Sequence, residues 1–422
     1  MSKLEISASK DHFARDGKPW FYLADTVWSA FTNIAPDEWE QYLDLRRLQG
    51  FNALQINILP QWDGAVAVYE PAPFKKLKNG KWDFLHREDA YFDKVRSMLR
   101  TARDRGMTPA LALLWCDYVA GTWAAAKLPD RQMPLEAIQP YVEYVGACFA
   151  EFDPIFLVSG DTDFKSPETL VRYQLALATI RKTCPQALTA FHLQPEADLP
   201  PEILNSPELD FYMFQSGHSL PQDTPYKLAR RFSTKAVKRP SVNGEPCYEG
   251  HGYGHTYGRF DAFEVRRAIW QSLLSGAKAG VTYGAHGIWS WHRPGTPFGA
   301  AAFSSLPYPW STSLRFPGAW DAGYAKWVFE TFALFDIEPM QDPVNGREEI
   351  RLSASPTRDK VALYSPYAAE VGLGIDLSRH ETFQVDLAER RILKPGLRHA
   401  SAGTVVSMSE VNADTLLLAI RK

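Results

Sequence analysis

Apolar runs of strand length alternate with helical stretches along most of this chain. Through about residue 340 the strand-like runs lie at residues 21–24, 53–59, 109–115, 155–159, 188–193, 211–215, 241–244 and 281–289. Amphipathic stretches with helical periodicity lie between them, at residues 36–50, 91–106, 135–151, 167–184 and 262–277. Eight alternations of strand and helix over this length predict a parallel barrel with right-handed crossovers, the (β/α)8 TIM barrel of the α/β class.

Local signals agree with this alternation. Pro36-Asp37-Glu38 is typical of a helix start, and Gly50 and Gly106 are placed to end two helices just before a strand. Asp16-Gly17 predicts the turn of a hairpin that precedes the first barrel strand and caps the bottom of the barrel. The fifth and sixth helices are expected to be short or irregular, within residues 197–240.

The pattern changes after about residue 337. Residues 349–353, 360–364, 383–386 and 415–419 form short, partly alternating segments separated by turn residues. They predict a small β-sandwich. Because 422 residues exceed one ordinary core, we expect two domains, a catalytic barrel over residues 1–338 and a C-terminal β-sandwich over residues 339–422.

Composition narrows the function classes. A hydrophobic share of 45% and a charged share of 23% are those of an ordinary globular protein. The net charge is −3 and no long basic block occurs, so nucleic acid and anionic membrane are not expected as partners. No cofactor motif is evident, and the sequence does not indicate an oligomeric state. Four widely spaced cysteines and a start without an apolar leader favour the cytoplasm.

Polar and aromatic side chains occur at the predicted carboxyl ends of the strands, where barrel enzymes carry their active sites. The candidates, in chain order, are Asp25, Trp28, Gln55, Trp62, Trp115, Asp117, Asp161, Asp163, His192, Gln215, His218, Glu245, Tyr248, Glu249, Trp289 and Trp291. Asp25 is a candidate binder of a substrate hydroxyl at the barrel floor. The tryptophans are candidate platforms for sugar rings, and the aromatic content of 13% suits such a site.

The type of reaction is predicted from the carboxyl groups at the strand ends. The chain lacks the sequence motifs of serine esterases, P-loop proteins and dinucleotide-binding proteins. Acids after the fourth and seventh strands lie on opposite sides of a barrel mouth, and glycoside hydrolysis needs two such groups. Asp161 and Glu245 are therefore the predicted catalytic pair. Asp163 competes with Asp161, and Glu249 competes with Glu245, although Pro246 favours Glu245 by ending the strand beside it.

Two other classes of function stay open. Six histidines fall in the predicted loops of the catalytic face, which raises a metal-dependent barrel hydrolase as an alternative. However, the end of the first strand carries Asp25 instead of the His-x-His that such enzymes usually show, so no metal ligand is predicted. A barrel that binds carbohydrate without catalysis is the other alternative. Long segments at residues 60–89 and 118–134 are placed to close one end of a cleft.

Several motifs resemble one known family. Phe21-Tyr-Leu-Ala-Asp25-Thr-Val-Trp28, Gly160-Asp161 and Asn243-Gly-Glu245-Pro-Cys-Tyr248-Glu249-Gly250 are similar to those of the apiosidase-like glycoside hydrolases, over most of residues 10–340. The tail, with Tyr364-Ser-Pro366, resembles the small β-domain that follows the barrel there, whose collagen-binding label we do not carry over. The resemblance implies a retaining glycosidase acting on a plant- or bacterial-type oligosaccharide or glycoside. Asp161 would be the acid/base and Glu245 the nucleophile.

Overall fold

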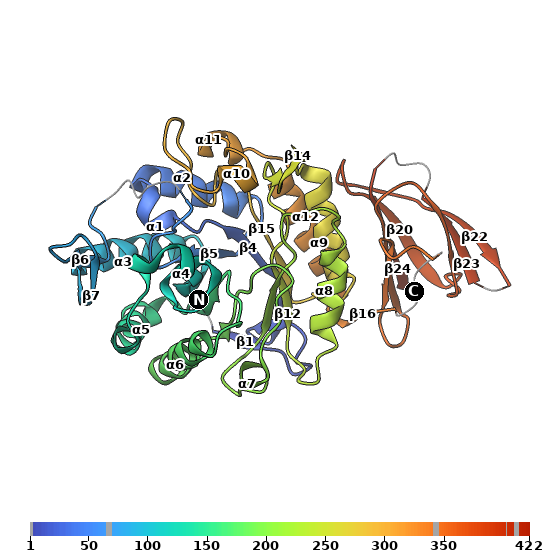
Figure 1. Ribbon diagram of the computed structural model, residues 1–422. Coiled ribbons are helices and arrows are strands. Elements are labelled where there is room, and N and C mark those ends of the chain that lie inside the picture. The colour runs from blue at the N-terminus through green and yellow to red at the C-terminus, as the bar shows by residue number, and fades with distance from the viewer. Residues whose placement is uncertain (1–2, 65–69, 341–345, 402, 409–412) are drawn as a thin grey trace.

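An eight-stranded parallel sheet forms the centre of the computed structural model, which describes residues 3–64, 70–340, 346–401, 403–408 and 413–422 (Figure 1). Its order is β10-β9-β8-β5-β4-β15-β12-β11, and a parallel bridge between His192 and Met213 links the two edges. The sheet is therefore nearly closed, and the predicted (β/α)8 barrel is confirmed. Its strands are β4 (Tyr22–Thr26), β5 (Ala53–Asn57), β8 (Thr108–Trp115), β9 (Ile155–Gly160), β10 (Thr189–Ala190), β11 (Tyr212–Gln215), β12 (Ser241–Glu245) and β15 (Gly280–Tyr283).

Two of these strands are shorter than predicted. β10 spans two residues, and the chain beyond it continues as isolated bridges at His192 and Leu193. β15 ends at Tyr283, and the ring of Tyr248 packs against the next residue, Gly284, where a Cβ would lie 2.1 Å from Tyr248 Cδ1. Trp289 therefore lies in a loop and not on a strand.

Helices surround the sheet and connect its strands. The longer ones are α2 (Pro36–Leu48), α3 (Asp89–Asp104), α5 (Leu135–Phe149), α6 (Pro167–Thr183), α8 (Thr224–Ser233), α9 (Ala262–Leu273) and α12 (Gly318–Thr331). The short ones are α1 (Ala30–Asn33), α4 (Trp123–Lys127), α7 (Pro201–Leu204), α10 (Ala301–Ser304) and α11 (Trp310–Ser313). The five helices predicted by periodicity form, and the fifth connection contains only the four-residue α7, as expected. The sixth connection, also expected to be short or irregular, instead contains the regular ten-residue α8.

The helix boundaries follow from local chemistry. Pro36 occupies the first turn of α2, and the Glu38 carboxylate accepts a 3.0 Å hydrogen bond from the Ala35 N–H. Gly50, just beyond that helix, adopts φ +91°, a left-handed conformation that costs glycine little. These contacts place α2 against the outside of the barrel and return the chain into β5.

A small antiparallel sheet lies at the lower end of the barrel in Figure 1, opposite α10, α11 and the β14 hairpin. It contains β1 (Leu4–Ile6), β2 (Phe13–Arg15) and β3 (Lys18–Trp20). Asp16 and Gly17 both have positive φ, as a tight two-residue turn requires. Phe13 packs edge-on against Phe211 at a centroid distance of 5.1 Å, so the predicted hairpin caps the barrel next to β11.

Two further hairpins rise from the loops after strands. They are formed by β6 (Phe74–Lys76) with β7 (Trp82–Arg87), and by β13 (Gly252–Tyr253) with β14 (Thr256–Arg259). The first belongs to the long segment expected to close a cleft, of which residues 65–69 lie outside the described residues. No helix in the described ranges has the length and apolar character needed to cross a bilayer.

The C-terminal region is a sandwich of two antiparallel sheets, as predicted (Figure 1). The larger sheet contains β16 (Glu338–Pro339), β17 (Arg351–Ala354), β18 (Lys360–Ser365), β24 (Thr415–Arg421), β20 (His380–Asp386) and β21 (Arg391–Leu393). The smaller contains β19 (Glu370–Leu373), β23 (Gly403–Ser407) and β22 (Gly396–Ala400). The domain division after residue 338 stays a prediction.

The central strands of the larger sheet, β18 and β24, are buried on both faces. Tyr364 and Leu418 belong to the same apolar cluster as the barrel, whereas Leu363 and Leu417 belong to a second cluster that includes Val406 of the smaller sheet. Alternation along β18 and β24 directs successive side chains to opposite faces. The sheet thus packs on the barrel with one face and closes the sandwich with the other.

Candidate active site

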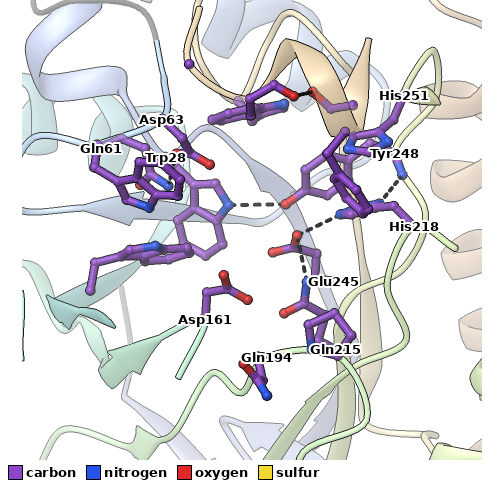
Figure 2. A pocket seen from close by; sticks show the side chains of 18 of the residues that line it. Trp28, Gln61, Asp63, Asp161, Gln194, Gln215, His218, Glu245, Tyr248 and His251 are labelled. Atoms are coloured by element: carbon purple, nitrogen blue, oxygen red, sulfur yellow. Dashed lines mark hydrogen bonds and ion pairs between the residues drawn. The ribbon is translucent and has the colours of Figure 1, made fainter. Parts of the chain in front are cut away.

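A cavity of about 520 Å³ opens at the carboxyl ends of the barrel strands (Figure 2). That volume lies within the usual range of small-molecule sites, about 300–1,000 Å³. Nine of the predicted site residues line it, namely Trp28, Trp62, Trp115, Asp161, Gln215, His218, Glu245, Tyr248 and Trp289. Residues from seven different strand ends thus meet in one hollow.

Glu245 ends β12 and is surrounded by hydrogen-bond donors. Gln215 Nε2 donates to its Oε1 at 3.1 Å, and His218 Nε2 lies 2.8 Å from the same oxygen. His192 Nε2 lies 3.2 Å from Oε2. Burial raises the pKa of Glu245, but the contacts with His192 and His218 outweigh burial and lower that pKa to about 2. The carboxylate is therefore ionised at neutral pH.

Backbone amides fix how the two histidines present their protons. The Tyr248 N–H donates to His218 Nδ1 at 3.3 Å, and the Asp161 N–H donates to His192 Nδ1 at 3.2 Å. An imidazole nitrogen that accepts carries no proton, so each ring holds a proton on Nε2. The Nε2–H of His218 is consequently directed at Oε1 of Glu245, and the protonated Nε2 of His192 lies 3.2 Å from Oε2.

Asp161 follows β9 in a different environment. Its backbone is left-handed, with φ +49°, which aspartate tolerates better than most residues. Burial raises its pKa well above the ordinary value, and the nearby carboxyl groups of Glu245, Asp63 and Asp163 raise it further. Figure 2 shows the carboxyl groups of Asp161 and Glu245 turned toward the same space. Two acids in one cavity thus have pKa values shifted in opposite directions.

Gly160 is needed beside Asp161 because the Trp115 ring lies directly over it. A Cβ on Gly160 would lie 1.8 Å from Trp115 Cε3, far inside contact distance. Trp115 in turn packs against Trp28, with ring centroids 4.8 Å apart, and the Trp28 Nε1–H donates to the Tyr248 hydroxyl at 3.1 Å. These rings form an apolar wall that extends from one carboxyl residue to the other.

Three predicted binders of substrate are instead buried beside the cavity. Asp25 accepts hydrogen bonds from Tyr42 at 2.7 Å and from Arg46 at 2.6 Å. Asp117 pairs with Arg131. Gln55 donates to the Gly244 carbonyl at 2.9 Å, immediately before Glu245. These groups are not among those lining the cavity, and their contacts hold the surrounding strands in place.

The remaining candidates also lie outside the cavity lining. Asp163 lies 3.2 Å from Lys165. Trp291 donates to Glu38 at 3.0 Å and stacks on Trp310.

Glu249 points away from the cavity, toward the start of α12. It accepts a 2.7 Å hydrogen bond from the Tyr283 hydroxyl and a 2.9 Å hydrogen bond from the Gly318 N–H. Burial raises its pKa to about 7. Glu249 therefore binds a helix N-terminus.

A stack of histidine rings continues from His218. His251 lies face to face with it at a centroid distance of 4.2 Å, and His286 follows at 4.9 Å from His251. His286 accepts from Trp289 Nε1 through Nδ1 at 3.1 Å, and its Nε2 lies 2.9 Å from the Ser305 carbonyl. Within the described ranges, no three histidine, cysteine or acidic side chains converge as metal ligands would. Of the loop histidines, His218, His251 and His286 are thus engaged with one another and with the backbone.

The sequence matches the family model of the apiosidase-like catalytic domain over residues 7–336. The chain belongs to the apiosidase-like family. It is accordingly a glycosidase with a carbohydrate substrate, as the sequence motifs implied. No curated protein matches the sequence.

Solved structures share the fold of this apiosidase-like chain. One, named a glycoside hydrolase, is 19% identical with a TM-score of 0.83, and the match covers 100% of this chain and 97% of that one. A family 5 glycoside hydrolase from Bacteroides vulgatus ATCC 8482 is also 19% identical with a TM-score of 0.83, over 99% and 93% of the two chains. A family 5 mannosidase from Rhizomucor miehei is 13% identical with a TM-score of 0.53, over 78% and 99%.

The structure brings residues into this apiosidase-like cavity that the sequence prediction did not include. The most notable is Asp63, which Gln61 holds through a 2.9 Å hydrogen bond. Burial raises the pKa of Asp63 to about 7. The motif Gln61-Trp62-Asp63 comes shortly after β5, so its position pointed to the active-site end of the barrel. The sequence alone did not distinguish Asp63 from an ordinary acidic loop residue.

The cavity rim also includes residues that were not among the predicted candidates, although the segment at residues 118–134 was predicted to close one end of a cleft. Lys127 and Trp123 belong to α4, and Phe303 belongs to α10. They reach the cavity only because long loops fold back over the barrel mouth.

Proposed function

We propose that this chain hydrolyses a glycosidic bond with retention of configuration, with Glu245 as nucleophile and Asp161 as acid/base. The observation that carries the proposal is the asymmetric environment of two acids in one cavity. Donors from three residues converge on Glu245, whereas Asp161 lies beside the Trp115 ring and other carboxyl groups. A retaining glycosidase needs one ionised and one protonated acid, and these environments supply that division.

The first half of the reaction breaks the glycosidic bond. A Glu245 oxygen attacks the anomeric carbon while the Asp161 proton passes to the departing glycosidic oxygen. The products are an ester between the sugar and Glu245, an Asp161 carboxylate and a free leaving-group alcohol. Nε2–H groups of His192 and His218 hold the Glu245 oxygens in position before the attack.

The second half releases the sugar. The Asp161 carboxylate takes a proton from water, and the resulting hydroxide oxygen bonds to the anomeric carbon as the ester bond to Glu245 breaks. Two displacements at the same carbon restore its configuration. The apolar wall of Trp28 and Trp115 suits the C–H face of the sugar held during both steps.

The competing acids fit other roles. Glu249 does not line the cavity, and its Oε2 already accepts from two donors, one of them at the start of α12. Asp163 is buried next to Lys165 and does not line the cavity. We assign them to helix and loop structure. The substrate is proposed to be a plant- or bacterial-type oligosaccharide or glycoside, bound in part by Trp62 and Trp289.

Aryl glycosides test the proposal. Glu245→Gln is expected to lower kcat by about 10⁴-fold or more, and Asp161→Asn by roughly 10²–10⁴-fold. The Asp161→Asn loss should be largest for poor leaving groups, since those need the proton most. Proton NMR of the first sugar released should show the configuration of the substrate, and release of the inverted anomer contradicts the retaining mechanism.

Matched variants separate the competing assignments. Glu249→Gln and Asp163→Asn should each keep kcat within about tenfold of wild type. A larger loss in either one moves the corresponding catalytic role to that residue. A wild-type chain that binds sugars without turnover supports the non-catalytic alternative, and activity abolished by prolonged EDTA dialysis supports the metal-dependent one.

A further inference from the structure

A second hollow, of about 350 Å³, adjoins the cavity and shares Pro195, His218 and Ser219 with it. One wall is the segment that follows β10, and the other runs from β11 into α8. The two walls touch where Gly217 packs on Pro195, since a Cβ on Gly217 would lie 3.1 Å from the Pro195 Cβ. The two hollows are therefore adjacent and share part of one wall.

Both walls are hydrogen-bonded to the segments that carry the catalytic pair. The backbone N–H groups of Ser216 and Gly217 donate to the Glu245 carbonyl at 3.0 and 3.1 Å. The Gln194 N–H donates at 2.9 Å to the carbonyl of Thr162, the residue after Asp161. These hydrogen bonds thus hold the second hollow next to the residues of the catalytic pair, Asp161 and Glu245.

Residues of the two hollows differ in exposure. Trp28 and Trp115, in the cavity beside the catalytic pair, are 2% and 6% exposed. Ser219 and Leu220, by contrast, are exposed at the rim of the second hollow. In Figure 2, Gln194 lies on the side of Asp161 away from Asp63. A sugar held through its anomeric carbon fits against these buried rings, and a leaving group on the other side of the catalytic pair lies toward the second hollow.

We propose that the second hollow binds the leaving-group part of the substrate, and that this part is an uncharged sugar unit. This inference rests on the proposed retaining hydrolysis. Pro195 and Leu220 offer apolar surface for a ring face, and Ser219 offers a hydroxyl for hydrogen bonding.

The charges of the second hollow are balanced within it. Lys227 pairs with Asp223, and Arg231 donates to the carbonyls of Glu196 and Ala197 at 3.0 and 2.8 Å. Among the described residues that line this hollow, both basic side chains therefore have partners already. A carboxylate on the ligand would have to compete with those partners, whereas an uncharged sugar does not.

The test compares substrates that share a glycone but differ in leaving group. Glycosyl fluorides release fluoride and leave the second hollow empty, whereas disaccharides fill it. The pairs are β-galactosyl fluoride with lactose, β-glucosyl fluoride with cellobiose, and β-apiosyl fluoride with β-apiosyl-glucose. Lys227→Trp narrows the hollow and should lower kcat/KM for the accepted disaccharide about tenfold relative to its fluoride. Thr234→Trp, at the exposed far end of α8, should leave that ratio at the wild-type value.

Each other result contradicts a specific part of the proposal. An unchanged ratio in Lys227→Trp means that the leaving group lies elsewhere. A wild-type preference for the disaccharide that carries glucuronate in place of glucose overturns the uncharged class. If the wild-type chain hydrolyses none of the fluorides, the proposed hydrolysis fails, and this inference falls with it. Fluoride turnover by Lys227→Trp also shows that the variant is folded.

Discussion

At the scale of single residues, neighbours decide what each acid of the cavity can do. Glu245 and Asp161 are both carboxylic acids at strand ends, yet the pKa of one is lowered to about 2 and the pKa of the other is raised. The difference comes from two histidine rings, each oriented by a backbone amide. Such contacts can be tested one group at a time.

The His218 contact should set the acid side of the pH profile. His218→Phe keeps a ring but removes the donor 2.8 Å from Glu245, so the pKa of Glu245 should rise. Because the nucleophile must be ionised, the acid limb of kcat/KM should move to higher pH than in wild type. His251→Phe, whose ring does not contact Glu245, is the control. An acid limb at the same pH in both variants contradicts the assigned role of His218.

Asp161 should reduce stability at neutral pH. Its folded-state pKa lies above the ordinary 3.8, so the stability linked to its proton is fully present below pH 3.8 and is lost as the pH rises through the folded-state pKa. The amide side chain in the Asp161→Asn variant does not titrate in this pH range. The unfolding free energy of this variant at pH 7 should exceed that of wild type by about 1 kcal/mol, and the difference should vanish near pH 3.8. Denaturant titrations at several pH values measure this, and a variant less stable than wild type at pH 7 contradicts it.

At the scale of secondary structure elements, polar groups at the ends of strands and helices join one element to the next. Glu249, just after β12, accepts the first N–H of α12 and the Tyr283 hydroxyl of β15. A carboxylate at a helix N-terminus satisfies donors that have no partner within the helix. One side chain thus connects three parts of the barrel that are separated in sequence.

Removal of that acceptor should destabilise the fold without abolishing turnover. Glu249→Ala leaves two buried donors without a partner and should cost about 2–3 kcal/mol of unfolding free energy. Below its melting temperature the variant should hydrolyse aryl glycosides at a rate within about tenfold of wild type. Glu168→Ala, on the exposed first turn of α6, is the control and should cost under about 0.5 kcal/mol. Lost turnover with unchanged stability would make Glu249 a catalytic residue.

At the scale of the whole molecule, a buried ionic network joins the barrel and the sandwich. Arg266 of α9 lies 2.9 Å from Asp321 of α12 and 2.7 Å from Asp414, which precedes β24 of the sandwich. Arg390 of the sandwich lies 3.0 Å from the second oxygen of Asp321. Apolar packing of the larger sheet on the barrel surrounds this network, so both parts are expected to unfold together.

Arg266→Met should therefore destabilise both parts. It leaves two buried carboxylates with fewer partners, at a cost of about 3–5 kcal/mol. Arg421→Met, which breaks the exposed pair with Asp359, should cost at most about 1 kcal/mol. Calorimetry should show one transition at a lower temperature for Arg266→Met. Two separated transitions in wild type contradict the expected coupling.

Fold prediction from the sequence succeeded where signals are local. Gly50, Asp16-Gly17 and the apolar runs specify turns, helix ends and strands through the conformation of a few neighbouring residues. The eighth strand was predicted too long, since it ends at Tyr283, just before Gly284 packs against the ring of Tyr248, which is distant in sequence. A pattern of apolar residues carries no information about such a contact.

The opposite strand ends that carry Asp161 and Glu245 were determined by the sequence alone, because strand periodicity fixes which residues end each strand. Tertiary structure decided which polar side chains face the cavity and which hold the barrel together. Asp25, Asp117 and Glu249 have local sequence contexts similar to those of Asp161 and Glu245, yet they contact Arg46, Arg131 and the start of α12. Asp63, in contrast, lines the cavity, and this placement also depends on the folded chain. The direction of a side chain and the pKa of its carboxyl group depend on partners supplied by distant segments, and those are fixed only when the barrel closes.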